Sequence, residues 1–478
     1  MVGLVASLGV GCSRKPAPAK AIDPARSVGS DATAREAVAI TVYNQNFGVV
    51  RERRGVALGR GHVELSYADV AAHIQPETVH IRSLDDPSSL AVLEQNYRYD
   101  LLTPETLLEK SVGKTIKVYR YNEKLGTEEA KAAEVLAVEQ GVVLRIDGQV
   151  TYDFQGRFAF PEVPPNLVAK PTLVWLLEST RPKQRVEVSY LTRGINWSAD
   201  YVLVLDASDR IGDLTGWVTL ANESGTSYED AQLKLVAGDV QRVQPPPPVA
   251  PDSDLSYAPA PMAAGAPAFK EEGLFEYHLY ALQRPTTIRD KEQKQVSLIE
   301  AHGVGVRKKL VFAGQQYFFR SSLPGPMPKQ KVGVFLELKN EEKNRLGIPL
   351  PKGVLRVYKA DGGGAQQFVG EDSIDHTPRD EEIRVRLGEA FDVVAERKQI
   401  RFSVLGECSS ESEWQVQLRN HKDVPETVEV LEPVGGDWEV FAPSHQPQRE
   451  DAGTLKFEVP VPAKGETTIR YRVRARWC

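Results

Sequence analysis

Acidic side chains and a single histidine gather between residues 370 and 382, in the stretch GEDSIDHTPRDEE. Carboxylate oxygens at short spacing in one loop converge readily on a divalent cation. The candidate ligands are Asp372, Asp375, His376 and Asp380. The segment lacks the fixed ladder of a calcium-binding loop, however, and it offers only one imidazole. We therefore predict no metal ion here and expect a structural corner between two domains, in which Asp372 and Asp375 bond backbone N–H groups.

The sequence contains no motif for the other kinds of catalysis considered. A serine hydrolase needs a nucleophile beside a base, yet the chain has no GxSxG motif, and the CSSES run at residues 408–412 is typical of a turn. No pair of carboxylates stands out as the acid and base of a glycosidase. The DGGG run at residues 361–364 lies between two strand patterns and predicts a hairpin turn rather than a phosphate-binding loop. We accordingly predict no catalytic residues and no cofactor.

The first twelve residues, MVGLVASLGVGC, resemble a bacterial lipoprotein signal. A short apolar segment ends in a small residue, Gly11, directly before Cys12, and a polar stretch follows. Two features depart from that pattern: Gly9 takes the place of the usual leucine, and no Lys or Arg precedes the apolar run. The resemblance implies lipid attachment through the sulfur of Cys12, which would anchor the chain to a membrane. The alternative is a frayed terminus with an incidental cysteine.

Two further cysteines, Cys408 and Cys478, lie in the last part of the chain. In an oxidising compartment they could form a disulfide that closes most of the final domain and contributes about 4 kcal/mol through chain entropy. Two free thiols are the alternative, because sequence does not show that the sulfurs meet. None of the three cysteines belongs to a CxxC pair, which argues against zinc and thiol-redox chemistry.

The composition is that of a folded protein with several domains. Its 478 residues exceed what one core organises, and 41% of them are apolar and 26% charged. The net charge of −6 provides no basic surface, so we predict no nucleic-acid partner. No apolar run approaches the roughly 20 residues that span a bilayer. The RERR run at residues 51–54 is typical of a solvated sheet face.

Short alternating strands, separated by Gly, Pro, Asn and Asp, dominate the chain from Ala37 onward. This pattern predicts an all-β fold of antiparallel sandwiches. Thr103 and Pro104 are the expected N-cap and first-turn residue of one short helix. The predicted organisation is a signal (1–12), a disordered tether (13–36), an N-terminal β-domain (37–112), a small β-barrel-like module (113–165), a central β-sandwich (166–394) with a Pro/Ala-rich loop (245–269), and an immunoglobulin-like C-terminal domain (395–478).

Three tryptophans, Trp175, Trp197 and Trp217, fall within the strands predicted for residues 171–240. Aromatic rings on one exposed face would suit a glycan, but rings of this kind also serve as core anchors. We expect the core position, and a glycan-binding module remains an alternative.

Several stretches between Ala37 and Trp477 carry a family resemblance, among them PTLVWLLES, YLTRGINWSADYVLVL, GWVTLANESGTSYEDAQLKLVAGDV, IPLPKGVLRVYK and FVGEDSIDHTPRDEEIRVRLGEAFDVV. In them the chain resembles an uncharacterised bacterial family, domain of unknown function 4139, which also occurs in mucoidy-inhibitor-type proteins. The resemblance implies a β-rich, often exported protein without an assigned activity, and it brings no catalytic residues. Some relatives bear a coiled-coil arm, whereas this chain has no heptad run.

Together these observations predict a non-catalytic lipoprotein of the bacterial periplasm or outer membrane, which binds or scaffolds envelope proteins or glycans. The membrane would be contacted through the lipid at Cys12. The rival hypothesis is a metal- or carboxylate-dependent hydrolase of envelope polymers that works through the acidic segment at residues 372–382.

Overall fold

The computed structural model describes residues 26–122, 126–139, 141–164, 167–242, 269–323, 327 and 330–478. About 64% of the chain is strand and 5% is helix, in several multi-stranded sheets, which confirms the predicted all-β multidomain fold. Across these described ranges no helix has the length and apolar character needed to cross a membrane. The chain divides into two compact units: the first comprises residues up to Val38 and Val50–Thr192, and the second comprises Ala39–Val49 and Arg193–Cys478.

The first unit contains a four-stranded sheet in the order β1-β4-β12-β6. Its strands are β1 (Arg26–Ser30), β4 (Gly61–Ala68), β12 (Thr172–Ser179) and β6 (Leu90–Arg98). In the same unit β5 (His80–Ser83) pairs antiparallel with β13 (Gln184–Arg193), while β2 (Arg35–Tyr43) and β3 (Phe47–Val56) each cross a unit boundary. Period-two alternation along β4 buries Leu65 and Tyr67 completely, and Trp175 is fully buried on β12, whose first four residues are all buried.

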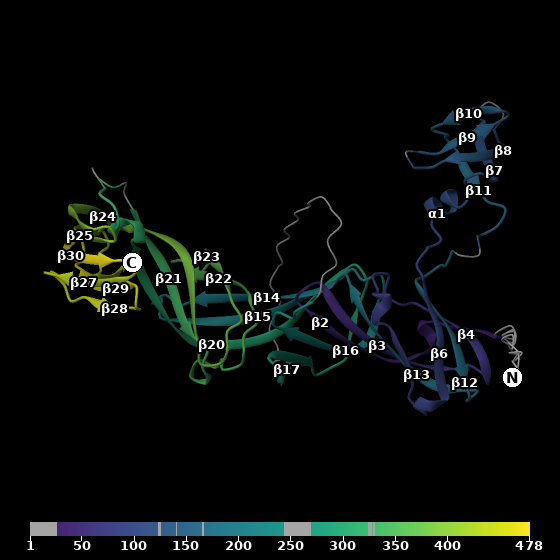
Figure 1. Ribbon diagram of the computed structural model, residues 1–478, viewed down its shortest axis with the longest axis horizontal. Helices are drawn as coiled ribbons and strands as arrows, with labels where there is room; N and C mark the ends of the chain where they lie inside the picture. The colour runs from purple at the N-terminus through teal and green to yellow at the C-terminus, as the bar shows by residue number, and fades with distance from the viewer. Residues whose placement is uncertain are drawn as a thin grey trace, which may run out of the picture. The chain divides into compact units, whose positions relative to one another are not determined.

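A small five-stranded module follows a short helix in this unit (Figure 1). The helix α1 (Pro104–Glu109) begins as predicted, because the Thr103 hydroxyl accepts the Thr106 N–H at 3.2 Å and Pro104 occupies the first turn. The module is an antiparallel sheet in the order β10-β9-β8-β7-β11, and in the described residues its outer strands β10 and β11 do not pair, so the sheet is open rather than a closed barrel. Its strands are β7 (Thr115–Asn122), β8 (Thr127–Ala137), β9 (Val143–Ile146), β10 (Gln149–Tyr152) and β11 (Arg157–Ala159).

The second unit begins with strands that pair over long sequence distances. Residues 39–43 of β2 lie parallel to residues 232–236 of β16 (Tyr228–Ala237). The other side of β16 pairs antiparallel with β18 (Tyr277–Leu282) and β19 (Thr286–Ile288), and β18 pairs with β17 (Phe269–Leu274).

Seven strands of the second unit form what we call the curled sheet, in the order β23-β22-β14-β15-β20-β21-β24. They are β23 (Gln366–Ile374), β22 (Gly353–Ala360), β14 (Ile195–Leu205), β15 (Ile211–Asn222), β20 (Glu292–Ala313), β21 (Gln330–Lys339) and β24 (Glu382–Gly406). Although β23 and β24 are the first and last strands in this order, the Arg386 N–H donates to the Asp372 carboxylate at 2.8 Å. The sheet therefore curls until its two ends meet.

The predicted boundary between the central and C-terminal domains lies after residue 394. Strand β24 runs across this position and enters the C-terminal sandwich (green to yellow in Figure 1). One layer continues from β24 into β25 (Ser409–Asn420), β30 (Glu466–Arg476) and β27 (Asp437–Phe441). The other joins the end of β20 to β26 (Glu426–Pro433), β29 (Thr454–Val461) and β28 (Gln448–Arg449). The core between the layers contains Trp414, Val428 and Phe457, all fully buried.

Short 3₁₀ helices occur in several connections of both units. They span Ala32–Ala34, Pro76–Thr78, Pro87–Ser89, Gln316–Phe319 and Glu342–Asn344.

Candidate functional site

The candidate ligands of the 370–382 segment do not converge on one point. The Asp372 carboxylate faces the backbone of β24, Asp375 is exposed beyond the end of β23, and Asp380 occupies a left-handed turn with φ 68°. Among the residues that the structure describes, no group of three His, Cys, Asp or Glu side chains is placed to hold a metal ion. Leu350 and Thr377 exchange two backbone hydrogen bonds of 2.9 Å, which fix the turn.

His376 is a half-buried support of this turn. Its Nδ1 accepts the backbone N–H of Lys352 at 3.2 Å, which assigns the proton of the neutral ring to the buried Nε2. Burial lowers the pKa of His376 below its usual value, and the Lys352 ammonium acts in the same direction, whereas Asp239 opposes them. The ring is therefore neutral at pH 7, and protonation at Nδ1 would break the hydrogen bond from Lys352.

Two β-bulges lie where the ends of the curled sheet meet. In the pairing of β22 with β23 the register skips Val369, and in the pairing of β21 with β24 it skips Leu387. Each bulged residue is followed by a glycine with positive φ, Gly370 at 151° and Gly388 at 148°. At Gly370 a Cβ atom would lie 2.4 Å from the Leu387 carbonyl oxygen, so the close approach of β23 and β24 requires glycine. Bulges re-aim side chains, and here both point into one hollow.

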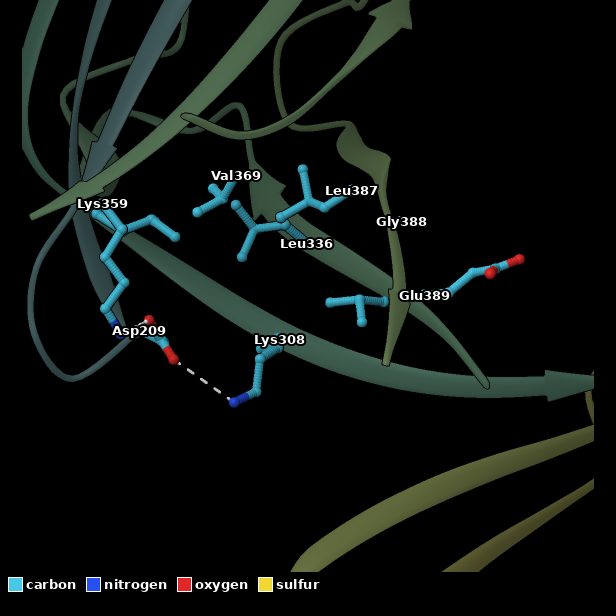
Figure 2. A pocket seen from close by; sticks show the side chains of 10 residues that line it. Asp209, Lys308, Leu336, Lys359, Val369, Leu387, Gly388 and Glu389 are labelled. Carbon is cyan, nitrogen blue, oxygen red and sulfur yellow. Dashed lines mark hydrogen bonds and ion pairs between the residues drawn. The ribbon is translucent and has the colours of Figure 1, made fainter. Parts of the chain in front are cut away.

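That hollow, which we call the bulge pocket, has a volume of about 230 Å³. Its floor is apolar, because Leu336, Val369 and Leu387 gather in its centre (Figure 2). The residues that line it come from six strands and one turn: Leu205, Asp209, Lys308, Val334, Leu336, Lys359, Val369, Leu387, Gly388 and Glu389. A preformed hollow with an apolar floor and a few polar groups at its edge is the usual form of a small-molecule site.

The charged edge of the bulge pocket is organised by Asp209, which adopts a left-handed conformation with φ 58° in the turn between β14 and β15. Lys359, on the strand beside β14, donates to one oxygen of this carboxylate, and Lys308 on β20 lies 3.5 Å from the other. Both lysines are about one-third exposed, at 31% and 33%. Glu389 turns away from the apolar floor (Figure 2) and pairs with Lys331.

Cys408 and Cys478, for which the sequence leaves a disulfide and two free thiols as alternatives, form a disulfide in the structure. Cys408, in the turn between β24 and β25, bonds the last residue, Cys478, with the two Cα atoms 5.6 Å apart. The bond closes the C-terminal sandwich across 70 residues of sequence. Cys12, the predicted lipid-attachment residue, lies outside the described residues.

The expected core position is confirmed for two of the three tryptophans. Trp175 is fully buried and donates to the Gln95 side chain at 2.8 Å, and Trp197 is 2% exposed and donates to the Val236 carbonyl at 3.3 Å. Trp217 is half-buried.

The first unit contains buried charged residues that the sequence analysis does not predict. The prediction of a solvated face for residues 51–54 is wrong for Glu52 and Arg54, which are both completely buried on β3, while Arg51 and Arg53, which alternate with them, are exposed. Alternation along the strand separates these residues onto two faces, but the composition does not indicate that the inward face carries a charge pair. An acid and a base two residues apart in a strand whose flanks are apolar is the only local signal.

The fold and the pocket define a class: an all-β, multidomain protein whose disulfide-closed sandwich continues from a curled sheet with a ligand-sized hollow. Residues 186–478 match the profile of the family described as Domain of unknown function (DUF4139). Because this match covers more than half of the chain, the protein belongs to that family. The bulge pocket and the disulfide both lie within the matched residues. Among curated proteins the chain has no match.

Proposed function

We propose that the protein is a non-catalytic binding protein of the cell envelope and that the bulge pocket is its ligand site. The observation that carries the proposal is the make-up of the pocket. Its lining consists of leucine, valine and glycine together with Asp209, Lys308, Lys359 and Glu389, whose charges are held in ion pairs. Such a lining supplies apolar area and fixed charge, which are the means of binding.

The site is also preorganised, which favours affinity. Beside the pocket, the contact between β23 and β24 is held by the hydrogen bond between Asp372 and Arg386 and by the close approach at Gly370. A pocket whose walls are fixed before the ligand arrives avoids the ordering cost of binding.

Native mass spectrometry of the protein purified from its own envelope tests this proposal. We expect a small-molecule adduct on the wild type and its loss in Val369→Trp, because the larger side chain fills the pocket. The matched control is Phe368→Trp, since the ring of Phe368 packs on Tyr358 with centroids 5.6 Å apart rather than lining the pocket. Absence of any adduct on the wild type, or equal adduct on both variants, would contradict the proposal.

We further propose that the protein works outside the cytoplasm and is held to a membrane by lipid at Cys12. The disulfide between Cys408 and Cys478 supports this location, because such bonds persist in oxidising compartments and are rare in the cytosol. The apolar segment that ends at Gly11 supports the anchor.

Labelling of cells with radioactive palmitate tests the anchor. We expect the wild type to be labelled and sedimented with membranes, and Cys12→Ala to lose both the label and the membrane fraction, because one or two acyl chains supply the attachment. Cys408→Ser/Cys478→Ser is the control that removes the other thiols and should keep its label. Equal labelling of wild type and Cys12→Ala would rule out lipid at Cys12.

A further inference from the structure

The ion pairs that begin at the charged edge of the bulge pocket contain unequal numbers of positive and negative groups. Lys308 and Lys359 share Asp209, and Lys308 also lies 3.7 Å from Glu426, which in turn pairs with Lys422 at 2.8 Å. Within this connected set three ammonium groups share two carboxylates, which leaves one positive charge. Glu389, the other acid of the lining, is paired with Lys331. An anion placed at this edge would complete the set, because opposite charges at short distance in a partly desolvated site attract strongly.

We propose that the ligand of the bulge pocket is a small amphiphile with one negative charge, such as a medium-chain carboxylate. This inference rests on the proposed function of the same pocket and names the chemistry of its ligand. The anionic group contacts Lys308 at the edge, and the apolar part lies on Leu336, Val369 and Leu387.

Lys308 is the anchoring cation because its present contacts are the looser ones. Its ammonium makes ion pairs of 3.5 Å and 3.7 Å, both longer than a hydrogen bond. Lys359, in contrast, donates to Asp209 and also to the Ala207 carbonyl at 3.3 Å. Turning the Lys308 side chain toward a ligand therefore sacrifices weaker contacts than turning the Lys359 side chain would.

The size of the hollow sets the size of the apolar part. A dry cavity of about 150 Å³ holds benzene. The bulge pocket, at about 230 Å³, accepts an apolar group somewhat larger than one aromatic ring. A chain of medium length fits this space, whereas a long acyl chain would have to leave it.

The arrangement disfavours a cationic ligand. Asp209 is already shared by two ammonium groups, and the Glu389 carboxylate points away from the floor toward Lys331 (Figure 2). A cation would therefore meet Lys308 and Lys359 without a free carboxylate to pair with.

Calorimetric titration of the full chain with octanoate, octanol and octylammonium tests the charge preference. We expect octanoate to bind about tenfold or more tightly than octanol, and octylammonium to bind most weakly, because a charge-assisted contact is made by octanoate alone. Lys308→Met should reduce octanoate to the level of octanol, and Lys308→Arg should keep the preference. The matched control is Lys464→Met, which removes an exposed lysine paired with Asp423 in the same unit.

Three results would count against the inference in distinguishable ways. Equal binding of the three probes, abolished by Val369→Trp, would overturn the anionic preference and leave the pocket as a binding site. Binding of octanoate that Lys308→Met leaves unchanged would overturn the role of Lys308. Failure of every probe to bind would remove the support of both this inference and the proposed function.

Discussion

Glu52→Gln is expected to lower the free energy of unfolding of the first unit by about 3–5 kcal/mol, the range for breaking a buried ion pair. Glu52 lies between two arginines: its carboxylate oxygens are 3.1 Å from Arg35 and 2.7 Å from Arg54, and the side chains of Glu52 and Arg54 have no exposed surface. Glutamine keeps the shape but removes the charge, so two guanidinium groups remain in the core without their anion.

The surroundings of Arg54 show why it cannot escape to solvent. Its guanidinium stacks on the Tyr67 ring at 3.6 Å and donates to the carbonyls of Ser30 at 3.2 Å and Ala68 at 2.8 Å. Burial, together with the Glu52 carboxylate, raises the pKa of Tyr67, so its hydroxyl remains a donor to Glu52. The network ties β3 to β1 and β4, and its loss should loosen all three.

Hydrogen exchange followed by mass spectrometry measures this effect locally. Peptides that cover β3 and β4 should exchange about a hundredfold faster or more in Glu52→Gln, while peptides of the second unit keep their rates. Glu64→Gln is the control, because Glu64 and Arg98 form an exposed pair at 4.0 Å whose loss should cost less than about 1 kcal/mol. Equal rates in Glu52→Gln and Glu64→Gln would show that the buried network contributes little.

The sequence predicts features that depend on neighbouring residues. Alternation predicts the all-β fold, and Thr103 followed by Pro104 predicts the start of the single α-helix in the described chain, because an N-cap and a first-turn proline act within one turn. Burial of Trp175 and Trp197 follows from their size and apolar surface within apolar strands.

Features that depend on distant pairing cannot be predicted in this way. The parallel pairing of residues 39–43 with 232–236 joins segments that no local pattern relates. The bulge pocket is similar: Asp209, Lys308 and Lys359 come together only because β14, β20 and β22 become neighbours in the curled sheet. The burial of charge also depends on distant pairing, because the RERR sequence is the same whether the inward face of its strand contacts water or Tyr67.

A local signal for the pocket did exist in its two glycines. Gly370 follows Val369 and Gly388 follows Leu387, in each case within a run that otherwise has strand character. An isolated glycine in a strand indicates a bulge or a close backbone approach, and here both occur. Of the acids next to these glycines, Asp372 joins β23 to β24 by accepting a backbone hydrogen bond. The acids hold the site together, while the bulged residues form it.

Arg397→Met is expected to destabilise the C-terminal sandwich by about 3–5 kcal/mol, because it leaves the carboxylate of Glu432 buried without its cation. Both side chains have no exposed surface, and the Arg397 guanidinium lies 2.7 Å from Glu432. The Tyr471 hydroxyl donates to the same carboxylate at 2.6 Å, and the other oxygen of Glu432 faces Gly314, where a Cβ would lie 2.2 Å away. The carboxylate therefore has no room to move toward water.

The double variant Arg397→Met/Glu432→Met separates the cost of an unpaired charge from the net contribution of the pair. We expect it to recover most of the lost stability, because two methionines fill the space without any charge to desolvate, and the hydrogen bonds lost are those of the Tyr471 hydroxyl and of the Gln330 side chain. Scanning calorimetry of both variants measures the difference, with Arg419→Met as the control for a partly exposed pair with Glu396. If the double variant is no more stable than Arg397→Met, the pair stabilises the sandwich through its own attraction, and the desolvation argument is wrong.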